Sequence, residues 1–330
     1  MKIFSGNSTI ELGNKICKYL DIPVGKIHLH QFPSGEQYCQ FQENVRGKDV
    51  YLIQSLSNPV NDNLMQLLIM ADAARRASAD RITAVVPYFG YARQDRKDKS
   101  RVPISAKLVM NLLGSAGFDR IVTMDLHSPQ VGGFTDLPFD HLTIKPALAE
   151  SIKDINIDVI VAPDIGAVKR VEEFSSIMKK DMAIISKKRN NERDVEVKHF
   201  IGDVNGKNVL IIDDLTESAG TLIEAASVCK EQKANEVYCA ISHGCFTSIG
   251  DMRLSKAFNE NIINRLFVSN SIDNVENLRL EKGDGLYGSG RCVSISNFRD
   301  KLTIVNVAPL FATAIKHIHN NESVSELFSV

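Results

Sequence analysis

Short runs of apolar and β-branched residues alternate with segments of helical periodicity along nearly the whole chain. In the first half this pattern predicts strands over residues 49–54, 81–87 and 120–125, and helices over residues 61–77 and 105–116. The segment between consecutive strands is long enough for a helical crossover. Such an alternation is typical of a parallel sheet that is covered by helices.

The second half of the chain repeats this alternation. Here the pattern predicts helices over residues 166–179 and 220–232, and strands over residues 158–162, 182–186, 208–212, 236–242 and 265–268. The two halves share an architecture but no convincing repeat of sequence. We therefore expect an α/β fold with two tandem doubly wound parallel-sheet domains.

The C-terminal part of the chain has the pattern of a strand over residues 303–309 and a helix over residues 310–320, which we expect to return to the first domain. The expected domains are residues 1–145 plus 304–330 and residues 146–303. Residues 274–300 are rich in Gly, Asn and charged side chains, which is typical of a mobile loop. We assign no chemistry to that loop.

The composition is that of an ordinary globular protein, with 44% hydrophobic and 24% charged residues among 330. The formal net charge of −1 argues against a general polyanion binder, so we expect no nucleic-acid partner and only local anion sites. The six cysteines form no C-x-x-C pair and are expected to be reduced core thiols. Neither a signal-peptide pattern nor a membrane-length apolar run is present, which predicts a soluble cytoplasmic protein without a membrane partner.

The most informative segment covers residues 208–221, where an apolar strand ends in two acids and is followed by a small-residue turn and a helix. The N–H groups at a helix N-terminus can hold a phosphate, and the Ser218 and Thr221 hydroxyls add donors. Asp213 and Asp214 could accept hydrogen bonds from two neighbouring sugar hydroxyls. An ordinary capped helix is the alternative, but capping does not require two adjacent acids. We therefore favour a sugar-phosphate site, a feature shared by several classes of enzyme that handle phosphorylated ribose.

Residues 32–36, Phe-Pro-Ser-Gly-Glu, combine an aromatic ring that can stack on a base with a carboxylate that can accept from an exocyclic amine. Pro-Ser-Gly is also common turn chemistry. Taken alone, the segment favours a β-turn over a base-binding site.

Two basic segments follow predicted strands. Residues 88–101 begin aromatic and become densely basic, which fits a polyphosphate clamp and a solvated loop equally well. Residues 186–193, Ser-Lys-Lys-Arg-Asn-Asn-Glu-Arg, lack the apolar periodicity of a helix. They fit a movable cationic loop that closes over a phosphoryl group, or else a basic surface turn.

Two further strand ends carry candidate metal ligands. His127 follows a predicted strand and could ligate a metal, although a lone histidine is more often an ordinary hydrogen-bonding residue. Asp164 opens a strand–acid–glycine–helix segment, where it could complete a metal shell or, equally well, cap the helix. The N–H groups of residues 165–167 could hold a second phosphate.

Taken together, these segments resemble ribose-phosphate pyrophosphokinase, the synthetase of phosphoribosyl pyrophosphate, across almost the whole chain. The motifs Tyr-Ala-Arg-Gln-Asp-Arg-Lys at residues 91–97, Asp-Leu-His-Ser-Pro-Gln at 125–130, and Asp-Asp followed by Ala-Gly-Thr within 213–221 occur in the family's order and spacing. The ending Ser-Val-Ser-Glu-Leu-Phe at residues 323–328 also resembles the family's C-terminus.

The resemblance implies two domains of the phosphoribosyltransferase type, the first binding ATP and the second ribose 5-phosphate. The family transfers the β,γ-diphosphoryl group of ATP to the C1 hydroxyl of ribose 5-phosphate, requires Mg²⁺, and releases AMP. The resemblance also implies a homo-oligomer, a hexamer in this family, with ADP and inorganic phosphate as allosteric effectors.

By motif position, the resemblance implies a role for each candidate residue. The adenine site would hold Phe32, Ser34, Gly35 and Glu36, with Arg93 and Gln94 on the nucleotide. His127 and Asp164 would hold Mg²⁺, and the catalytic Lys187 and Arg189 would close over the β-phosphate. The ribose hydroxyls would meet Asp213 and Asp214, and the 5-phosphate would meet Glu217, Ser218, Ala219, Gly220 and Thr221. Phosphoryl transfer needs chiefly alignment and charge neutralisation, which these residue types supply.

Several positions depart from the common family pattern. Ser34 stands where an Asp usually accepts from the adenine amino group, which loosens the expected nucleotide selectivity. Glu217 and Ser218 replace Asp-Thr, and Ile165 and Ala167 make the turn after Asp164 bulkier. Residues 274–300 are longer than the family's usual segment. Two other interpretations are therefore a non-catalytic regulatory homologue of the synthetase and, less favoured, a phosphoribosyltransferase.

Overall fold

A computed structural model describes residues 1–191, 194–273 and 300–327, and the side chains of residues 187–199 lie outside this description. Its chain splits into two compact units. Of the described residues, unit 1 holds 1–144, 271–273 and 306–327, and unit 2 holds 145–270 and 300–305. The loop expected at residues 274–300 lies outside the described residues except for its last position.

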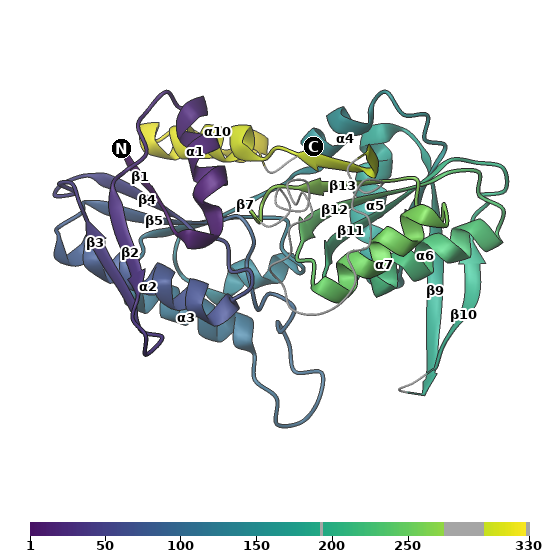
Figure 1. Cartoon of the computed structure of the whole chain (residues 1–330), viewed down its shortest axis with the longest axis horizontal. Helices are drawn as coiled ribbons and strands as arrows, with labels where there is room; N and C mark the ends of the chain where they lie inside the picture. Colours follow the sequence, from purple (N-terminus) through teal and green to yellow (C-terminus); the bar gives the residue numbers. More distant parts are fainter. Residues whose placement is uncertain (192–193, 274–299, 328–330) are drawn as a thin grey trace. The chain divides into compact units, whose positions relative to one another are not determined.

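Unit 1 is built on a parallel five-stranded sheet with the order β1-β4-β5-β6-β7 (Figure 1). Its strands are β1 (Lys2–Ser5), β4 (Asp49–Ile53), β5 (Arg81–Val86), β6 (Arg120–Met124) and β7 (Phe139–Leu142). The strands predicted over 49–54, 81–87 and 120–125 are confirmed. A separate antiparallel pair, β2 (Ile27–Gln31) and β3 (Gln37–Phe41), packs against helix α2 through β3.

The helices of unit 1 cover both faces of its sheet (Figure 1). Helix α1 (Ile10–Tyr19) packs against α10 (Ala308–Asn320), and α2 (Val60–Arg76) packs against α3 (Ser105–Ala116). Short 3-10 turns lie at η1 (Asn7–Thr9), η2 (Pro129–Phe134) and η4 (Ser325–Leu327). Both faces of the strands are therefore buried, which explains their nearly continuous apolar sequence.

Unit 2 is built on a seven-stranded sheet with the order β10-β9-β8-β11-β12-β13-β14. Its strands are β8 (Val159–Ala162), β9 (Asp181–Asn191), β10 (Asp194–Ile201), β11 (Val209–Thr216), β12 (Val237–Gly244), β13 (Arg265–Ser269) and β14 (Leu302–Val305). All neighbours are parallel except β9 and β10. The expected α/β class with parallel sheets is confirmed in both units.

Helices α4 (Lys145–Ile152), α5 (Val168–Met178), α6 (Gly220–Glu231) and α7 (Ser248–Asn259), with the 3-10 turn η3 (Ile165–Ala167), complete unit 2. Helices α6 and α7 pack on each other, and α5 contacts β8, β9 and β11 (Figure 1). Strand β14 pairs with β13, whereas the helix that follows, α10, belongs to unit 1. Among the helices that the structure describes, none combines the length and the apolar character needed to cross a membrane.

One sequence expectation is wrong at the level of the backbone. Residues 186–193 were expected to form a loop, but β9 continues to Asn191 and pairs with β10, with Lys187 opposite Val197 and Arg189 opposite Val195. The reason is the partner strand, in which Val195 and Val197 alternate with polar residues as a strand requires. An extended partner supplies the backbone hydrogen bonds that a basic segment alone does not predict.

Candidate functional site

The carboxyl end of β11 carries two acids where the strand has lost one neighbour. β8 ends at Ala162, just past its pairing with Ile211, so beyond that point β11 pairs only with β12 among the described strands. The side chain of Asp213 is 19% exposed and that of Asp214 only 5% exposed. Two adjacent carboxylates therefore lie largely out of water, which is costly without a positive partner.

Arg170 of helix α5 supplies that partner. Its Nη1 donates to Asp213 Oδ1 at 3.0 Å, and its Nη2 lies 3.3 Å from Asp214 Oδ1. Asp213 Oδ1 also accepts the backbone N–H of Asp214 at 2.9 Å. A single guanidinium thus holds both carboxylates.

Burial of Asp213, followed by repulsion from Asp214, raises the pKa of the Asp213 carboxyl to about 8, although Arg170 acts in the opposite direction. The three charged groups carry one excess negative charge when both acids are ionised. A strongly perturbed acid beside a specific charge partner is typical of a functional site.

The turn after this strand has the form expected of a phosphate cradle. Ala219 adopts the left-handed conformation with φ 56°, and helix α6 begins at Gly220. The first turn of a helix leaves N–H groups without intrahelical acceptors, and here that turn begins at Gly220, after the residues 215–219 that follow the acid pair. The prediction of a strand–turn–helix segment at residues 208–221 is confirmed, but the strand continues through both acids to Thr216 instead of ending at residue 212.

A second segment of unit 2 holds the backbone of this turn in place. Glu217 O accepts from Thr247 N at 3.1 Å, and Ser218 O accepts from Arg253 Nη1 at 3.4 Å. Cys245 N donates to Thr216 O at 2.9 Å. With its carbonyls held from one side, the turn has a fixed conformation. No local sequence pattern distinguishes Arg170, Thr247 and Arg253 from surface residues, so these three residues could not be predicted from the sequence.

Asp164 lies in the loop after β8, and β8 is the parallel neighbour of β11. Its Oδ1 accepts the Ala167 N–H at 3.0 Å and so caps η3. The capping role is thereby confirmed, while the second carboxylate oxygen is of the type that Mg²⁺ prefers. Ile165, which follows, is 66% exposed.

In unit 1, His127 is an exposed residue just after β6. The loop that carries it is anchored to the neighbouring strand β7, since Leu126 N donates to His141 Nε2 at 2.8 Å. Asp125 has φ 41° and its Oδ1 accepts from Ile144 N at 3.3 Å. Within the described residues, no group of three or more His, Cys, Asp and Glu side chains gathers in a way that could hold a metal ion.

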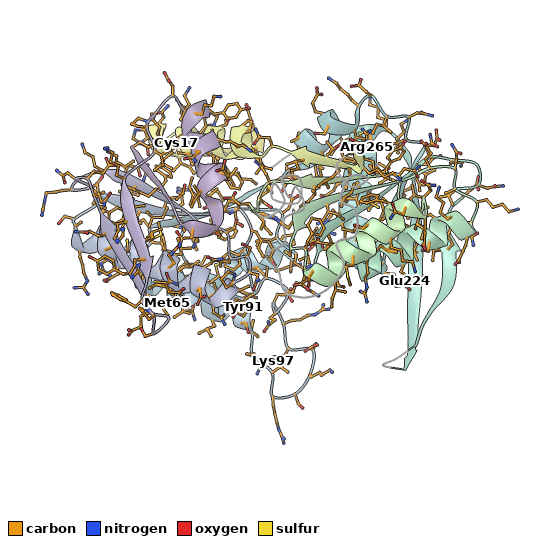
Figure 2. The ribbon with its side chains drawn as sticks, in the orientation of Figure 1. Cys17, Met65, Tyr91, Lys97, Glu224 and Arg265 are labelled. Atoms are coloured by element: carbon orange, nitrogen blue, oxygen red, sulfur yellow. The ribbon has the colours of Figure 1, made fainter. Side chains whose placement is uncertain are left out.

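The loop from β5 to α3, in which Figure 2 labels Tyr91 and Lys97, also carries Arg93 and Gln94. Strand β5 is the parallel neighbour of β6. Gln94 is fixed from both sides, because its N–H donates to Tyr91 O at 2.9 Å and its Oε1 accepts from Ser105 Oγ at 2.6 Å. Arg93 and Lys97 are exposed. The loops after β5 and β6 therefore bring the candidates Arg93, Gln94 and His127 to one edge of the unit 1 sheet.

The turn between β2 and β3 confirms the β-turn expected at residues 32–36. Gly35 has φ 92° and donates its N–H to Phe32 O at 2.8 Å. Ser34 Oγ donates to Glu36 Oε2 at 2.8 Å, and the Phe32 ring is 44% exposed. A turn and an accessible aromatic face therefore occur together here. The remaining candidates, Lys187 and Arg189, are described only by their place in β9.

Comparison with known proteins covers both units. Residues 1–117 match the N-terminal domain of ribose phosphate pyrophosphokinase, and residues 141–260 match a phosphoribosyl transferase domain. The chain is 41% identical to a ribose-phosphate pyrophosphokinase of Fusobacterium nucleatum, covering 100% of this chain and 98% of the relative. It is 43% identical to that of Chlorobaculum tepidum, with coverages of 99% and 95%.

A solved structure agrees with these sequence matches. The phosphoribosylpyrophosphate synthetase of Mycobacterium smegmatis superposes with a TM-score of 0.84 at 34% identity, covering 97% of this chain and 99% of that one. The similarity extends over both units and includes the acid pair, the turn that follows it and the basic segment at residues 88–101. The chain belongs to the ribose-phosphate pyrophosphokinase family.

Proposed function

We propose that this protein is an active ribose-phosphate diphosphokinase, which transfers the β,γ-diphosphoryl group of ATP to the C1 hydroxyl of ribose 5-phosphate. The products are phosphoribosyl pyrophosphate and AMP. The observation that carries the proposal is the end of β11, where a partly buried acid, Asp213, and a buried acid, Asp214, precede a helix N-terminus on one strand–turn–helix segment. Carboxylates suit the sugar hydroxyls, and the helix N-terminus suits the 5-phosphate.

Each substrate is assigned to one domain. Residues 146–303 bind ribose 5-phosphate through Asp213 and Asp214 at the hydroxyls and Glu217–Thr221 at the phosphate. Residues 1–145 with 304–330 bind ATP, with Phe32, Ser34, Gly35 and Glu36 at the adenine and Arg93 and Gln94 on the nucleotide. The accessible Phe32 ring and the fixed Gln94 support this assignment.

We assign the resident metal as Mg²⁺, with Asp164 and His127 as protein ligands. Asp164 fits by chemistry, because its cap engages Oδ1 and a second carboxylate oxygen remains. His127 fits less closely, since imidazole more often binds Zn²⁺, Cu²⁺ or Fe²⁺. When bound, magnesium neutralises charge on the polyphosphate. Asp164→Asn should raise the Mg²⁺ concentration needed for half-maximal binding of a non-hydrolysable ATP analogue.

Lys187 and Arg189 are assigned to the β-phosphate, where positive charge offsets the charge that develops during transfer. Lys187→Ala should lower kcat about 100-fold while changing nucleotide affinity less than about threefold. The matched control is Lys169→Ala, because Lys169 is an exposed residue of helix α5. If Lys187→Ala lowered nucleotide affinity and kcat by the same factor, Lys187 would have no role specific to the transfer step.

The test of the reaction uses the full chain with ATP, Mg²⁺ and ribose 5-phosphate. Phosphorus NMR should detect AMP and phosphoribosyl pyrophosphate in equal amounts, and label from the γ-phosphate of ATP should enter the sugar product. Binding of ribose 5-phosphate without this product, at all phosphate and metal concentrations tried, would identify a non-catalytic homologue. Product formation only when a nucleobase and phosphoribosyl pyrophosphate are supplied would identify a phosphoribosyltransferase.

By the same family membership we propose a cytoplasmic homo-oligomer, a hexamer, that inorganic phosphate activates and ADP inhibits. Light scattering on the purified chain measures the subunit number directly. Initial rates with and without phosphate, at fixed free Mg²⁺, measure activation. A monomer with phosphate-independent rates would contradict both parts of this proposal.

A further inference from the structure

The side chain of Arg170 links two elements of unit 2 that lie far apart in the sequence. It projects from helix α5 and meets the end of β11, 43 residues further along the chain. Its two terminal nitrogens engage different carboxylates, at 3.0 Å on Asp213 and at 3.3 Å on Asp214. The Arg170 side chain is 21% exposed and that of Asp213 19% exposed, so this contact lies mostly out of water. A planar guanidinium that engages two acids at once restricts the orientation of both.

We propose that Arg170 is a positioning residue for sugar recognition, which holds the Asp213 and Asp214 carboxylates together as acceptors for two adjacent ribose hydroxyls. Consecutive side chains of a strand point to opposite faces, so neighbouring acids do not by themselves converge on one ligand. Because both carboxylates contact the guanidinium of Arg170, they lie close enough together to face one ligand. This inference rests on the proposed function, because it deepens the assignment of the ribose site.

Charge supports the same role. A protonated carboxyl loses part of its acceptor capacity, and both burial and the neighbouring Asp214 raise the pKa of Asp213 to about 8. The positive charge of Arg170 opposes that shift. Arg170 is a cation that faces the pair at ion-pair distance, with Nη1 3.0 Å from Asp213 Oδ1 and Nη2 3.3 Å from Asp214 Oδ1. Removal of its charge should therefore leave the pair protonated over a wider pH range.

The position of Arg170 also connects the sugar site with the Asp164 loop. Asp164 caps the 3-10 turn that leads directly into α5, and Arg170 lies in the first turn of that helix. A rigid helix therefore joins the cap to the acid pair. Lys169, the neighbouring residue, is exposed and forms no described ion pair with the acids, which makes it a matched control.

The experiment compares wild type, Arg170→Met, Arg170→Lys and Lys169→Met in the complete chain, using ribose 5-phosphate and 2-deoxyribose 5-phosphate as alternative substrates. Wild type should strongly prefer ribose 5-phosphate, because a site built for a hydroxyl rejects the analogue that lacks it. Arg170→Met should lower that preference at least about tenfold and raise the KM for ribose 5-phosphate, with the KM for ATP changed less than about twofold. Arg170→Lys should recover part of the preference, and Lys169→Met should behave like wild type.

A pH profile separates positioning from general damage. In Arg170→Met the acidic limb of kcat/KM for ribose 5-phosphate should move to higher pH, because the acid pair keeps its protons longer. Circular dichroism establishes whether each variant is folded, and Arg170→Lys serves if Arg170→Met is not. A folded variant with unchanged discrimination and an unchanged pH profile would overturn the inference. Absence of product from the wild type would instead remove the proposed function, so the two failures are distinct.

Discussion

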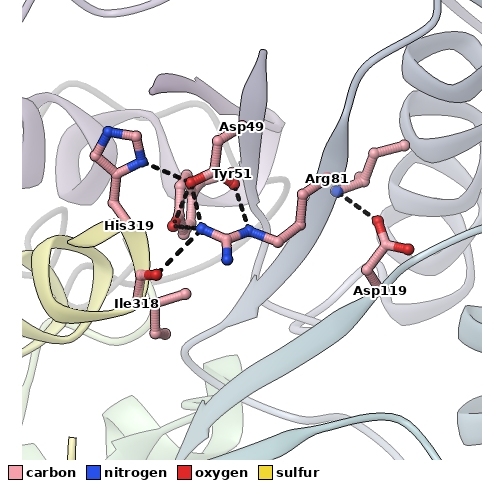
Figure 3. A network of polar contacts seen from close by, with 7 residues as sticks. Asp49, Tyr51, Arg81, Asp119, Ile318 and His319 are labelled. Atoms are coloured by element: carbon pink, nitrogen blue, oxygen red, sulfur yellow. Dashed lines mark hydrogen bonds and ion pairs between the residues drawn. The ribbon is translucent and has the colours of Figure 1, made fainter. Parts of the chain in front are cut away.

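Asp49 and Arg81 form a two-bond ion pair between the first residues of the neighbouring strands β4 and β5 (Figure 3). Arg81 Nε donates to Asp49 Oδ1 at 2.8 Å, and Arg81 Nη2 donates to Asp49 Oδ2 at 2.5 Å. The same Nη2 donates to Ile318 O at 3.1 Å, and His319 Nδ1 lies 2.7 Å from Asp49 Oδ2. The pair therefore fastens the last turn of α10 to the sheet of unit 1.

Arg81→Met should destabilise unit 1 by about 2 kcal/mol, because it leaves a mostly buried carboxylate and a helix carbonyl without their cation. The Asp49 side chain is 11% exposed and that of Arg81 28%. Hydrogen exchange of α10 measures the loss locally. Arg76→Met is the control, since the side chains of its pair with Asp72 are 78% and 53% exposed and solvent screens their interaction. Equal effects of the two variants would contradict a special role for Arg81.

The same pair predicts an acid-sensitive attachment of α10. Burial opposes ionisation of Asp49, but hydrogen bonds from Arg81, His319 and Tyr51 outweigh it and hold the pKa of the carboxyl below its ordinary value. A lowered folded-state pKa means that the stabilisation is complete above the unfolded pKa, about 4, and is lost as the pH falls through the folded value. Protection of α10 against exchange should therefore decrease below about pH 4. Asp49→Asn should remove most of this dependence, and an identical decline in both proteins would argue against it.

Asp213→Asn should stabilise unit 2 while abolishing turnover. The raised pKa of Asp213 means that the folded state binds its proton more tightly than the unfolded state, so the free energy of unfolding falls as the pH rises from about 4 to 8. A neutral amide removes that cost, and the gain at pH 8 should be on the order of 1 kcal/mol. Thermal unfolding at pH 5 and pH 8 measures the gain, which should be larger at pH 8. A variant that is less stable than wild type at pH 8 would show that the acid pair carries no such cost.

Gly250→Ala should destabilise the protein and weaken ribose 5-phosphate binding, although Gly→Ala within a helix ordinarily stabilises by about 1 kcal/mol. A Cβ on Gly250 would press into the carbonyl oxygen of Glu217, whose backbone forms the cradle. Calorimetric titration with ribose 5-phosphate should show affinity reduced about tenfold. Gly114→Ala in α3 is the control, because a Cβ there meets only Leu137 Cδ1 at 4.0 Å. If both substitutions stabilised the protein, the backbone of Glu217 would not be packed tightly against Gly250 of α7, contrary to this prediction.

The central strands could be predicted because parallel strands buried on both faces need continuous apolar runs, such as residues 209–212 in β11. The hairpin β2–β3 was missed because the strand prediction relied on continuous apolar runs, whereas these half-exposed strands alternate polar with apolar residues, as in Ile-His-Leu-His-Gln. Strand β9 was predicted too short because its basic end is extended only through pairing with β10. The type of each element followed the local pattern, whereas the length of β9 depended on its pairing with the edge strand β10.

The sequence by itself determined the α/β class, the strand–turn–helix of the acid pair and its order relative to the other strand-end motifs, because each depends on short-range periodicity and spacing. Only the tertiary structure decided that Arg170 meets Asp213 and Asp214, and that His319 meets Asp49 across 270 residues. In a local sequence window, arginine, aspartate and histidine are expected to be exposed to solvent. Folding buries some of these charged side chains, and a buried charge is costly unless a partner of opposite charge lies beside it.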